Sequence, residues 1–149
     1  MKMYVAYGSN MNVEQMSRRC PDAKVFGTGL LHGYKIVFRG RSNGVANIEP
    51  AEGSTVPVVL WKISPSDEKA LDVYEGYPHL YHKEDVTVVR KGKKVKGMAY
   101  IMDPIRPLAS PSGYYLGVIA DGYDLFGLDA DDLFKAAVDC GVRGALYEN

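Results

Sequence analysis

Residues 1–16, MKMYVAYGSNMNVEQM, change from a strand pattern to a helix pattern within a few positions. Met3–Tyr7 is a short apolar run of the kind that forms a buried strand. Three residues that favour turns, Gly-Ser-Asn, follow it at once. Asn12 then suits the N-cap of a helix, and Gln15 completes the spacing of a capping box. We expect a strand over Met3–Tyr7, a tight turn and a helix over Val13–Arg19.

The turn at Gly8, Ser9 and Asn10 has two explanations. Glycine allows a tight turn, and serine and asparagine are common in loops, so an ordinary strand-to-helix connection accounts for the sequence. Backbone N–H groups beside the first turn of a helix also form a site that binds a carboxylate or an oxyanion. The turn by itself does not decide between a plain connection and a ligand-binding loop.

The composition indicates a globular protein of ordinary size. The chain has 149 residues, of which 46% are hydrophobic and 24% charged, so we expect a single domain over 1–149. Its 18 basic and 18 acidic residues cancel, which does not favour a nucleic-acid partner. No apolar window reaches the length of a membrane span, so we expect no membrane partner. Cys20 and Cys140 lie in no CxxC pair; one disulfide is possible, but free thiols in the cytoplasm are the simpler interpretation.

The remaining segments mix strand and helix signals without a regular alternation. Strands are expected over 23–31, 34–39, 56–63, 81–90 and 95–102, with a turn at Gly33 and a loop and short strand within 40–50. Helices are expected from the N-cap Ser64 to Gly76, over Ser112–Leu125, and over Ala130–Asp139 with Gly141 closing the last. The pattern predicts an α+β fold: a small, mostly antiparallel, barrel-like sheet of six or seven strands with four flanking helices.

Glu75 is the most unusual charged residue of the chain. It falls at the C-terminal end of the helix that starts after Ser64, where the negative backbone partial charge disfavours an acid. Its neighbours from Val73 to Pro78 are mostly apolar or aromatic, so both effects raise the pKa of the carboxyl. A carboxyl with a raised pKa can take up and return a proton near neutral pH. An exposed acid at a frayed helix end is the ordinary alternative.

Other residues offer weaker candidates for chemistry. Ser9 can be considered as a nucleophile, but the GxSxG spacing of a nucleophile elbow is absent, and only His32, His79 and His82 can supply an imidazole base. His79 and His82 lack the further ligands that a metal site needs, so we expect no metal. Gly27–Gly33 has GxGxxxG spacing and no helix signal after it, which argues against a dinucleotide fingerprint.

Taken together, these features resemble the γ-glutamylcyclotransferase-like superfamily over nearly the whole chain. The resemblance rests on Tyr7-Gly8-Ser9-Asn10 near the start and on Tyr74-Glu75-Gly76-Tyr77 in the middle of the chain. Tyr81 and the segment Pro111–Tyr115 also match family positions. The resemblance implies a small barrel with flanking helices around a cavity, and an activity that uses no metal or organic cofactor.

The resemblance also implies roles for individual residues. Glu75 is expected to be the catalytic acid/base. The γ-glutamyl group is expected to be bound by a loop and two tyrosines, namely Tyr7, Gly8, Ser9, Asn10, Tyr81 and Tyr115, with Tyr114 as the rival of Tyr115. Residues 77–81 are expected to line the side of the pocket that receives the leaving group.

The implied reaction converts a γ-glutamyl amino acid or γ-glutamyl amine to 5-oxoproline and a free amine. The substrate's α-amino group attacks its own γ-carbonyl, while Glu75 removes a proton from that amine and returns it to the leaving amine. The expected partner is therefore a small-molecule γ-glutamyl substrate; the leaving amine and the oligomeric state, monomer or homodimer, stay open. Two alternatives are a binding module that retains the pocket without turnover, and an acyl hydrolase that depends on Ser9.

Overall fold

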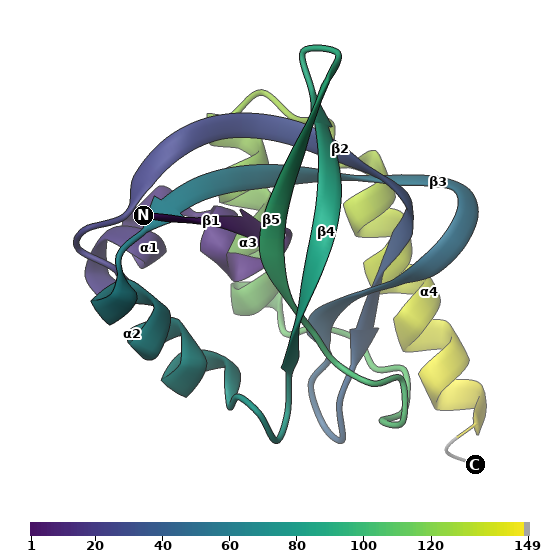
Figure 1. Ribbon diagram of the computed structural model, residues 1–149. Coiled ribbons are helices and arrows are strands. Elements are labelled where there is room, and N and C mark those ends of the chain that lie inside the picture. Colours follow the sequence, from purple (N-terminus) through teal and green to yellow (C-terminus); the bar gives the residue numbers. More distant parts are fainter. Residues whose placement is uncertain (148–149) are drawn as a thin grey trace.

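In the computed structural model, which describes residues 1–147, five strands close into a barrel in the order β1-β3-β2-β4-β5 (Figure 1). The strands are β1 (Lys2–Ala6), β2 (Lys24–Arg39), β3 (Val45–Ile63), β4 (His82–Arg90) and β5 (Lys93–Ile101). All neighbouring strands pair antiparallel except β1 and β5, which are parallel where Tyr4 meets Met98. The predicted α+β fold with a mostly antiparallel barrel is confirmed.

β2 and β3 form one long hairpin that makes up much of the barrel wall. They pair along most of their length, with register shifts between Val25 and Gly27 and between His32 and Tyr34, the second of which leaves residues 51–54 of β3 without partners on β2. The expected turn at Gly33 is wrong, because Gly33, with a φ of +83°, lies at the second irregularity inside β2. A positive φ suits a bulge as well as a turn, so the glycine alone did not distinguish them. Residues 1–147 consequently contain five strands instead of six or seven.

The β4–β5 hairpin has the tightest connection in the sheet. Its two turn residues, Lys91 and Gly92, both have positive φ, at 50° and 74°. Positive φ at both central residues is the geometry of a type I′ turn, which matches the twist of two antiparallel strands. The hairpin projects beyond the rest of the barrel at the top of Figure 1, and Lys91, Lys93 and Lys94 lie at its tip.

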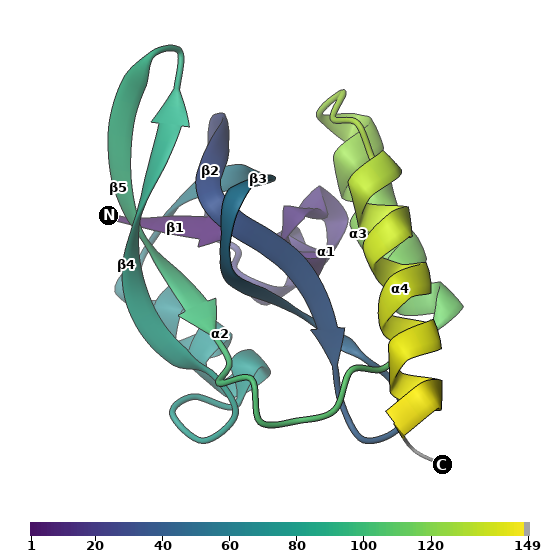
Figure 2. The same cartoon turned by 90° about the vertical axis from the view of Figure 1, so that its right-hand side faces the viewer.

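Four α-helices and one short 3₁₀ turn flank the barrel: η1 (Ser9–Met11), α1 (Val13–Arg19), α2 (Pro65–Glu75), α3 (Gly113–Leu125) and α4 (Asp131–Tyr147). α3 and α4 lie on the same side of the barrel, at the right of Figure 2. α2 begins with a complete capping box formed by Ser64 and Asp67, and α3 begins at the N-cap Ser112. Each helix in the described range is too short or too polar to cross a membrane.

α4 extends further than the sequence predicted. It continues past Gly141, which was expected to end it, and past Gly144 to Tyr147. Both glycines face the segment before α3: a Cβ on Gly144 would lie 2.1 Å from the Leu108 carbonyl oxygen, and one on Gly141 would lie 3.2 Å from the Ser110 Cβ. The glycines therefore allow close packing of the helix on this segment, and neither is a helix end.

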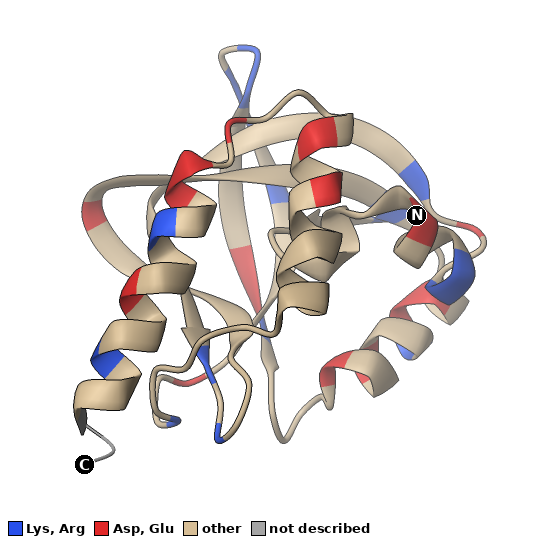
Figure 3. Cartoon of the chain, turned by 180° about the vertical axis from the view of Figure 1, so that it is seen from behind, with Lys and Arg blue, Asp and Glu red and all other residues tan. Residues whose placement is uncertain are grey.

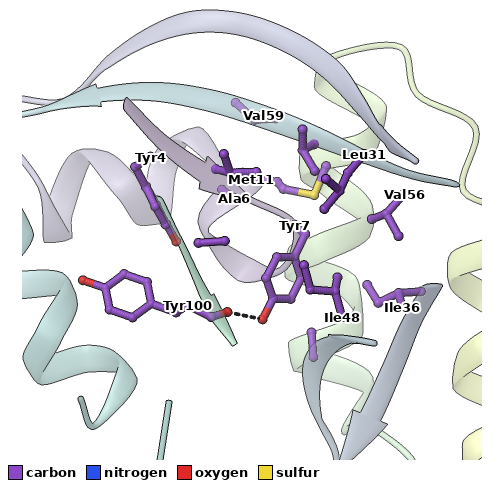
Figure 4. Close-up of a cluster of buried hydrophobic side chains, with 14 of the residues drawn as sticks. Tyr4, Ala6, Tyr7, Met11, Leu31, Ile36, Ile48, Val56, Val59 and Tyr100 are labelled. Atoms are coloured by element: carbon purple, nitrogen blue, oxygen red, sulfur yellow. Dashed lines mark hydrogen bonds between the residues drawn. The ribbon is translucent and has the colours of Figure 1, made fainter. Parts of the chain in front are cut away.

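The core fills the barrel with aliphatic and aromatic side chains that all five strands contribute, and Figure 4 shows part of it. Tyr4, Tyr7 and Tyr100 belong to the same buried cluster. The rings of Tyr4 and Tyr100 meet edge to face, with centroids 5.9 Å apart. A buried phenol normally needs a hydrogen-bond partner for its hydroxyl. The three tyrosines therefore require hydrogen-bond partners for their hydroxyls in this part of the apolar core.

Candidate active site

The Gly-Ser-Asn turn after β1 forms η1, in which Ser9 and Asn10 are buried. Its backbone closes on itself, because the Met11 N–H donates to the Gly8 carbonyl at 3.0 Å. Gly8 also lets the turn approach β3, since a Cβ at this position would lie 3.2 Å from the Ala46 Cβ. The short turn is therefore held against the barrel wall, and it presents its residues toward the interior.

Glu75 is the last residue of α2, and the helix ends behind it at Gly76 in the left-handed conformation, with a φ of 64°. The side chain is partly buried and reaches η1, where Asn10 Nδ2 donates to Glu75 Oε1 at 3.4 Å. Burial raises the pKa of Glu75 to about 7, against an opposing effect of the Arg19 charge. A carboxyl in this range can both accept and return a proton near neutral pH.

Asn10 connects Glu75 to a second charged residue. Its Nδ2 also donates to the Tyr4 hydroxyl at 2.9 Å, and its Oδ1 accepts from the Arg19 guanidinium. Because arginine can only donate, this contact fixes which end of the amide faces Glu75. The Arg19 guanidinium also stacks on Tyr74, with Cζ 3.4 Å from the ring centroid. Arg19 thus orients the amide and places a positive charge near Glu75.

Three predicted tyrosines are fixed by backbone contacts in two different ways. Tyr7 donates to the Tyr100 carbonyl at 2.6 Å (Figure 4), and Tyr81 donates to the Ala46 carbonyl at 2.7 Å. The Tyr115 hydroxyl instead accepts from the Ala46 N–H at 2.9 Å, so it retains a proton that it can donate to a ligand. Burial raises the pKa of all three phenols, which therefore stay protonated.

A cavity of about 270 Å³ brings together every residue that was predicted to act as the acid/base or to bind the γ-glutamyl group. Tyr115 lines it, whereas Tyr114 is 78% exposed, so the structure places Tyr115 and not its neighbour in the cavity. The predicted residues in its wall are Tyr7, Gly8, Ser9, Asn10, Glu75, Tyr81 and Tyr115. The remaining wall residues are Tyr4, Val45, Ala46, Tyr74, Leu80 and Tyr100.

Four residues of the site were not predicted from the sequence: Tyr4, Tyr74, Tyr100 and Arg19. Tyr74 belongs to a segment that carries the family resemblance, but it was given no role; its side chain is 43% exposed and its hydroxyl lies 2.8 Å from Ser9 Oγ. The chain has 11 tyrosines against 4 phenylalanines, an excess that favours phenols in the interior but does not identify them. Arg19 gave no signal, because a basic residue in the last turn of a helix is ordinary.

The segment 77–81 approaches the cavity with only part of its length. Leu80 and Tyr81 line the cavity, whereas Tyr77 packs edge-on against Tyr100, with ring centroids 6.4 Å apart. Lys83 Nζ lies 4.2 Å from the centroid of the Tyr77 ring. Tyr77 therefore stands behind Tyr100, so it can influence a ligand only through that ring.

Ser9 lacks the neighbours that a nucleophilic serine requires. Its hydroxyl is hydrogen-bonded to the Tyr74 hydroxyl, and within the described part of the chain no histidine lines the cavity. His32 instead contacts the Thr55 hydroxyl at 2.9 Å, and His82 pairs with Glu84 at 2.6 Å on the surface. Without an adjacent imidazole to take its proton, Ser9 is poorly placed for covalent catalysis.

The chain is similar to known γ-glutamyl cyclotransferases in sequence and in structure. The model of the family described as "Gamma-glutamyl cyclotransferase, AIG2-like" matches residues 4–122. The gamma-glutamylcyclotransferases of Homo sapiens and Bos taurus are each 32% identical over 136 residues, which cover 85% of this chain and 72% of either relative. A solved structure of a gamma-glutamyl cyclotransferase superposes with a TM-score of 0.82 at 29% identity, covering 91% of this chain and 85% of the other. Because the family model spans most of the chain, the protein belongs to the γ-glutamyl cyclotransferase, AIG2-like family.

Proposed function

We propose that this protein is a cyclotransferase that converts a γ-glutamyl amino acid or γ-glutamyl amine to 5-oxoproline and a free amine. The observation that carries the proposal is the Glu75 carboxyl, with its pKa raised to about 7, in the wall of a small cavity next to η1. Membership of the γ-glutamyl cyclotransferase, AIG2-like family supports the same reaction. A cavity of about 270 Å³ suits a small substrate that is folded upon itself.

Glu75 acts as both base and acid in the proposed reaction. Its carboxylate takes a proton from the α-amino group of the substrate, and the freed nitrogen attacks the γ-carbonyl carbon to form the ring C–N bond. Glu75 then gives the proton to the leaving nitrogen as the original C–N bond breaks, so the carboxylate is regenerated. Both steps need a carboxyl that exchanges protons near neutral pH. A well-oriented intramolecular attack is worth about 7–11 kcal/mol relative to the bimolecular reaction, and the cavity contributes by holding the substrate in that orientation.

The substrate is held by hydrogen-bond donors around the cavity. The proposed wall consists of Tyr7, Gly8, Ser9, Asn10 and Tyr81, and it binds the γ-glutamyl group. Tyr115 has a proton to spare, because its oxygen already accepts from the Ala46 N–H. We assign Tyr115 as a donor to a carboxylate or carbonyl oxygen of the substrate. One such donor to a developing oxyanion contributes about 3–4 kcal/mol.

Two further features complete the proposal. The leaving group is an amino acid or another amine, and it is accommodated near Leu80 and Tyr81, the members of segment 77–81 that line the cavity. The protein works in the cytoplasm, which is supported by the presence of Cys20 and Cys140 as buried free thiols.

The test is a mass-spectrometric assay for 5-oxoproline with a panel of γ-glutamyl amino acids and γ-glutamyl amines. The wild type should release 5-oxoproline from at least one class, and Glu75→Gln should release none above background. Ligand affinity without product in both proteins would indicate a binding module. Product release that is lost in Ser9→Ala and accompanied by labelling with an activated phosphonate would indicate a serine hydrolase. Either of these two results would overturn the cyclotransferase proposal.

A further inference from the structure

Glu75 carries the only charge among the described residues that line the cavity. The Lys and Arg residues lie elsewhere, for example at the tip of the β4–β5 hairpin and along α4 (Figure 3). The negative charge that forms on the γ-carbonyl oxygen in the proposed reaction must therefore be met by neutral hydrogen-bond donors. Because so many tyrosines line the cavity, the direction in which each phenol donates decides which of them can serve.

Three of these phenols give their proton to the protein. Tyr7 donates to the Tyr100 carbonyl, and Tyr81 donates to the Ala46 carbonyl. Tyr100 donates to Asp72 Oδ1 at 2.6 Å, and its hydroxyl points away from that of Tyr7 in Figure 4. A phenol has a single proton, so these three tyrosines can only accept a hydrogen bond from a substrate.

Tyr4 has the opposite arrangement. Its hydroxyl accepts from Asn10 Nδ2 at 2.9 Å, and this amide cannot be reversed, because Arg19 donates to Asn10 Oδ1 and has no acceptor to offer. Within residues 1–147, the Tyr4 proton has no acceptor, although the side chain is only 3% exposed. Since Tyr4 lines the cavity, a ligand in the cavity is what this proton can reach.

Tyr4 lies next to the carboxyl that carries the proton in the proposed reaction. Asn10 Nδ2 donates both to the Tyr4 hydroxyl and, at 3.4 Å, to Glu75 Oε1, so the phenol and the carboxyl share one nitrogen. Tyr115, the other phenol with a free proton, belongs to a different part of the wall. A Cβ on Gly8 would lie 3.7 Å from the Tyr115 hydroxyl. The two free phenol protons therefore serve different parts of a substrate.

Electrostatics separates the same two phenols. Burial raises the pKa of Tyr4 well above its ordinary value, and the Glu75 carboxylate is the next cause of this rise. Burial also raises the pKa of Tyr115, but there the Glu75 carboxylate has a smaller effect than Tyr74. Both phenols stay protonated, and Tyr4 is the one on which the Glu75 charge acts more directly.

We propose that Tyr4 is a catalytic residue, whose hydroxyl donates a hydrogen bond to the γ-carbonyl oxygen of the substrate as that oxygen becomes an oxyanion. The inference rests on the proposed cyclotransferase reaction. The attacked carbon lies between the two nitrogens with which Glu75 exchanges a proton, so its oxygen lies beside Glu75, where Tyr4 is. Tyr115 is then left to bind the α-carboxylate.

Tyr4 keeps its own proton throughout the reaction. The α-amino nitrogen forms a bond to the γ-carbonyl carbon, the π pair of the C=O bond moves onto the oxygen, and Glu75 takes the proton from the amine. The charged oxygen then accepts a stronger hydrogen bond from Tyr4 than the neutral carbonyl did. When the electron pair returns, the bond to the leaving nitrogen breaks, and that nitrogen takes the proton from Glu75.

Tyr4→Phe removes the donor and keeps the ring, and a binding experiment tests it without turnover. The probe is a five-membered cyclic phosphonamidate that carries the α-carboxylate, because its tetrahedral P–O⁻ group stands in for the oxyanion; planar 5-oxoproline is the reference. In calorimetric titrations, Tyr4→Phe should lose about 10- to 100-fold in affinity for the phosphonamidate, as expected for a hydrogen bond to a charged group, and at most about threefold for 5-oxoproline. Equal losses for both compounds, or a wild type that does not prefer the phosphonamidate, would overturn the proposal.

Two matched variants control this result. Tyr115→Phe removes the other free phenol proton, so it should weaken both compounds to the same extent, because both carry the α-carboxylate. Tyr34→Phe removes a phenol from β2 outside the cavity and should change neither affinity. Selective loss of phosphonamidate binding in Tyr115→Phe instead of Tyr4→Phe would assign the oxyanion to Tyr115 and overturn the proposal.

Steady-state kinetics tests the same role in turnover. Tyr4→Phe should lower kcat for 5-oxoproline release by about 10²- to 10³-fold, the loss typical of one oxyanion donor, with KM within about threefold. The part of the pH profile that reports Glu75 should keep its position, because Asn10 still donates to that carboxyl; a shifted profile would show that Tyr4 only supports Asn10. Product from the wild type with an unaffected Tyr4→Phe refutes the role of Tyr4 alone, whereas a wild type without product refutes the cyclotransferase reaction itself.

Discussion

The pKa values of acidic side chains are shifted in opposite directions at the two ends of α2. At the N-terminal end, Asp67 accepts from the Ser64 N–H at 3.1 Å, and Glu68 accepts from Lys83 Nζ at 2.8 Å. The hydrogen bond from Lys83 is the main cause that lowers the pKa of Glu68. At the C-terminal end, burial raises the pKa of Glu75 to about 7. One helix thus holds acids that stabilise the fold at its start and an acid suited to proton transfer at its end.

This difference follows from where the charge is placed. A helix N-terminus presents unpaired N–H groups, so carboxylates there gain hydrogen bonds and a favourable field. A helix C-terminus presents carbonyl oxygens, and Glu75 is in addition withdrawn from water into the cavity wall. The stability of α2 and the reactivity of Glu75 are therefore separate properties of one helix.

Neutralising the acid at each end should separate catalysis from folding. Glu75→Gln should lower kcat/KM for 5-oxoproline formation by about 10²- to 10⁴-fold, the contribution of a general acid/base. Glu68→Gln removes an acid from the same helix without touching the cavity, and it should change kcat/KM by no more than about twofold. Steady-state kinetics of both variants at one pH give the comparison. Equal losses in the two variants would show that the end of the helix does not matter.

The stability of the protein should respond to pH with opposite signs at the two ends. The pKa of Glu75 is raised from 4.5 to about 7, so the folded state binds this proton more tightly than the unfolded state does. Ionisation of Glu75 therefore lowers the free energy of unfolding. The loss is absent below pH 4.5, grows as the pH rises toward 7, and above that reaches at most about 3 kcal/mol, reduced because the side chain keeps some contact with solvent. For Glu68, whose pKa is lowered, stability is present above the unfolded pKa and is lost as the pH falls through the folded value.

Urea unfolding at about pH 5 and about pH 8.5 measures this contrast. Glu75→Gln should leave the free energy of unfolding nearly unchanged at the lower pH and raise it at the higher pH. Glu68→Gln should not raise it at either pH. A Glu75→Gln protein that is less stable than the wild type at the higher pH would contradict a raised pKa at this position.

Removing the charge of Arg19 should move the pKa of Glu75, at the C-terminal end of α2, further from its ordinary value. The charge of Arg19 lowers the pKa of Glu75 against the dominant effect of burial, so Arg19→Gln should raise that pKa further. The acid limb of the kcat/KM profile should then move to higher pH, with a several-fold loss at pH 6 that largely recovers at pH 8. Arg18→Gln is the matched control, because Arg18 pairs with Glu14 on the surface, at 2.5 Å, and does not touch the site. A uniform loss at all pH values would mean that Arg19 acts only on structure.

Local signals were sufficient for the parts of the molecule that are decided within a few residues. The strand before Gly8, the N-cap at Ser64 and the unfavourable place of Glu75 on its helix all followed from neighbouring residues in the sequence. Gly33 and Gly141 were misjudged for one shared reason. A glycine is compatible with a turn, a bulge, a helix end or a close contact, and only the packing partner decides among them.

The site depended on contacts that local sequence does not contain. Arg19 acts through Asn10 and Tyr74, which come to it from a different turn and a different helix. Tyr81 and Tyr115 were proposed from family resemblance. Tyr81, directly before β4, and Tyr115, in α3, both hydrogen-bond to the backbone of Ala46. Neither spacing nor composition relates these three positions. Tertiary structure alone brings them together.

The smallest effect is expected at the N-terminal end of α2. Ser64 Oγ accepts from the Asp67 N–H at 3.1 Å, so Ser64→Ala should lower the free energy of unfolding by about 1 kcal/mol, a typical loss for an N-cap. Activity should stay within about twofold, because the lost bond lies at the end of the helix away from Glu75. Ser17→Ala is the control: Ser17 Oγ donates to the Glu14 carbonyl within α1, and alanine is the better helix former there. If Ser64→Ala reduced kcat/KM as strongly as Glu75→Gln while the protein remained folded, the two ends of α2 would be coupled, and stability and proton transfer could not be assigned to separate ends.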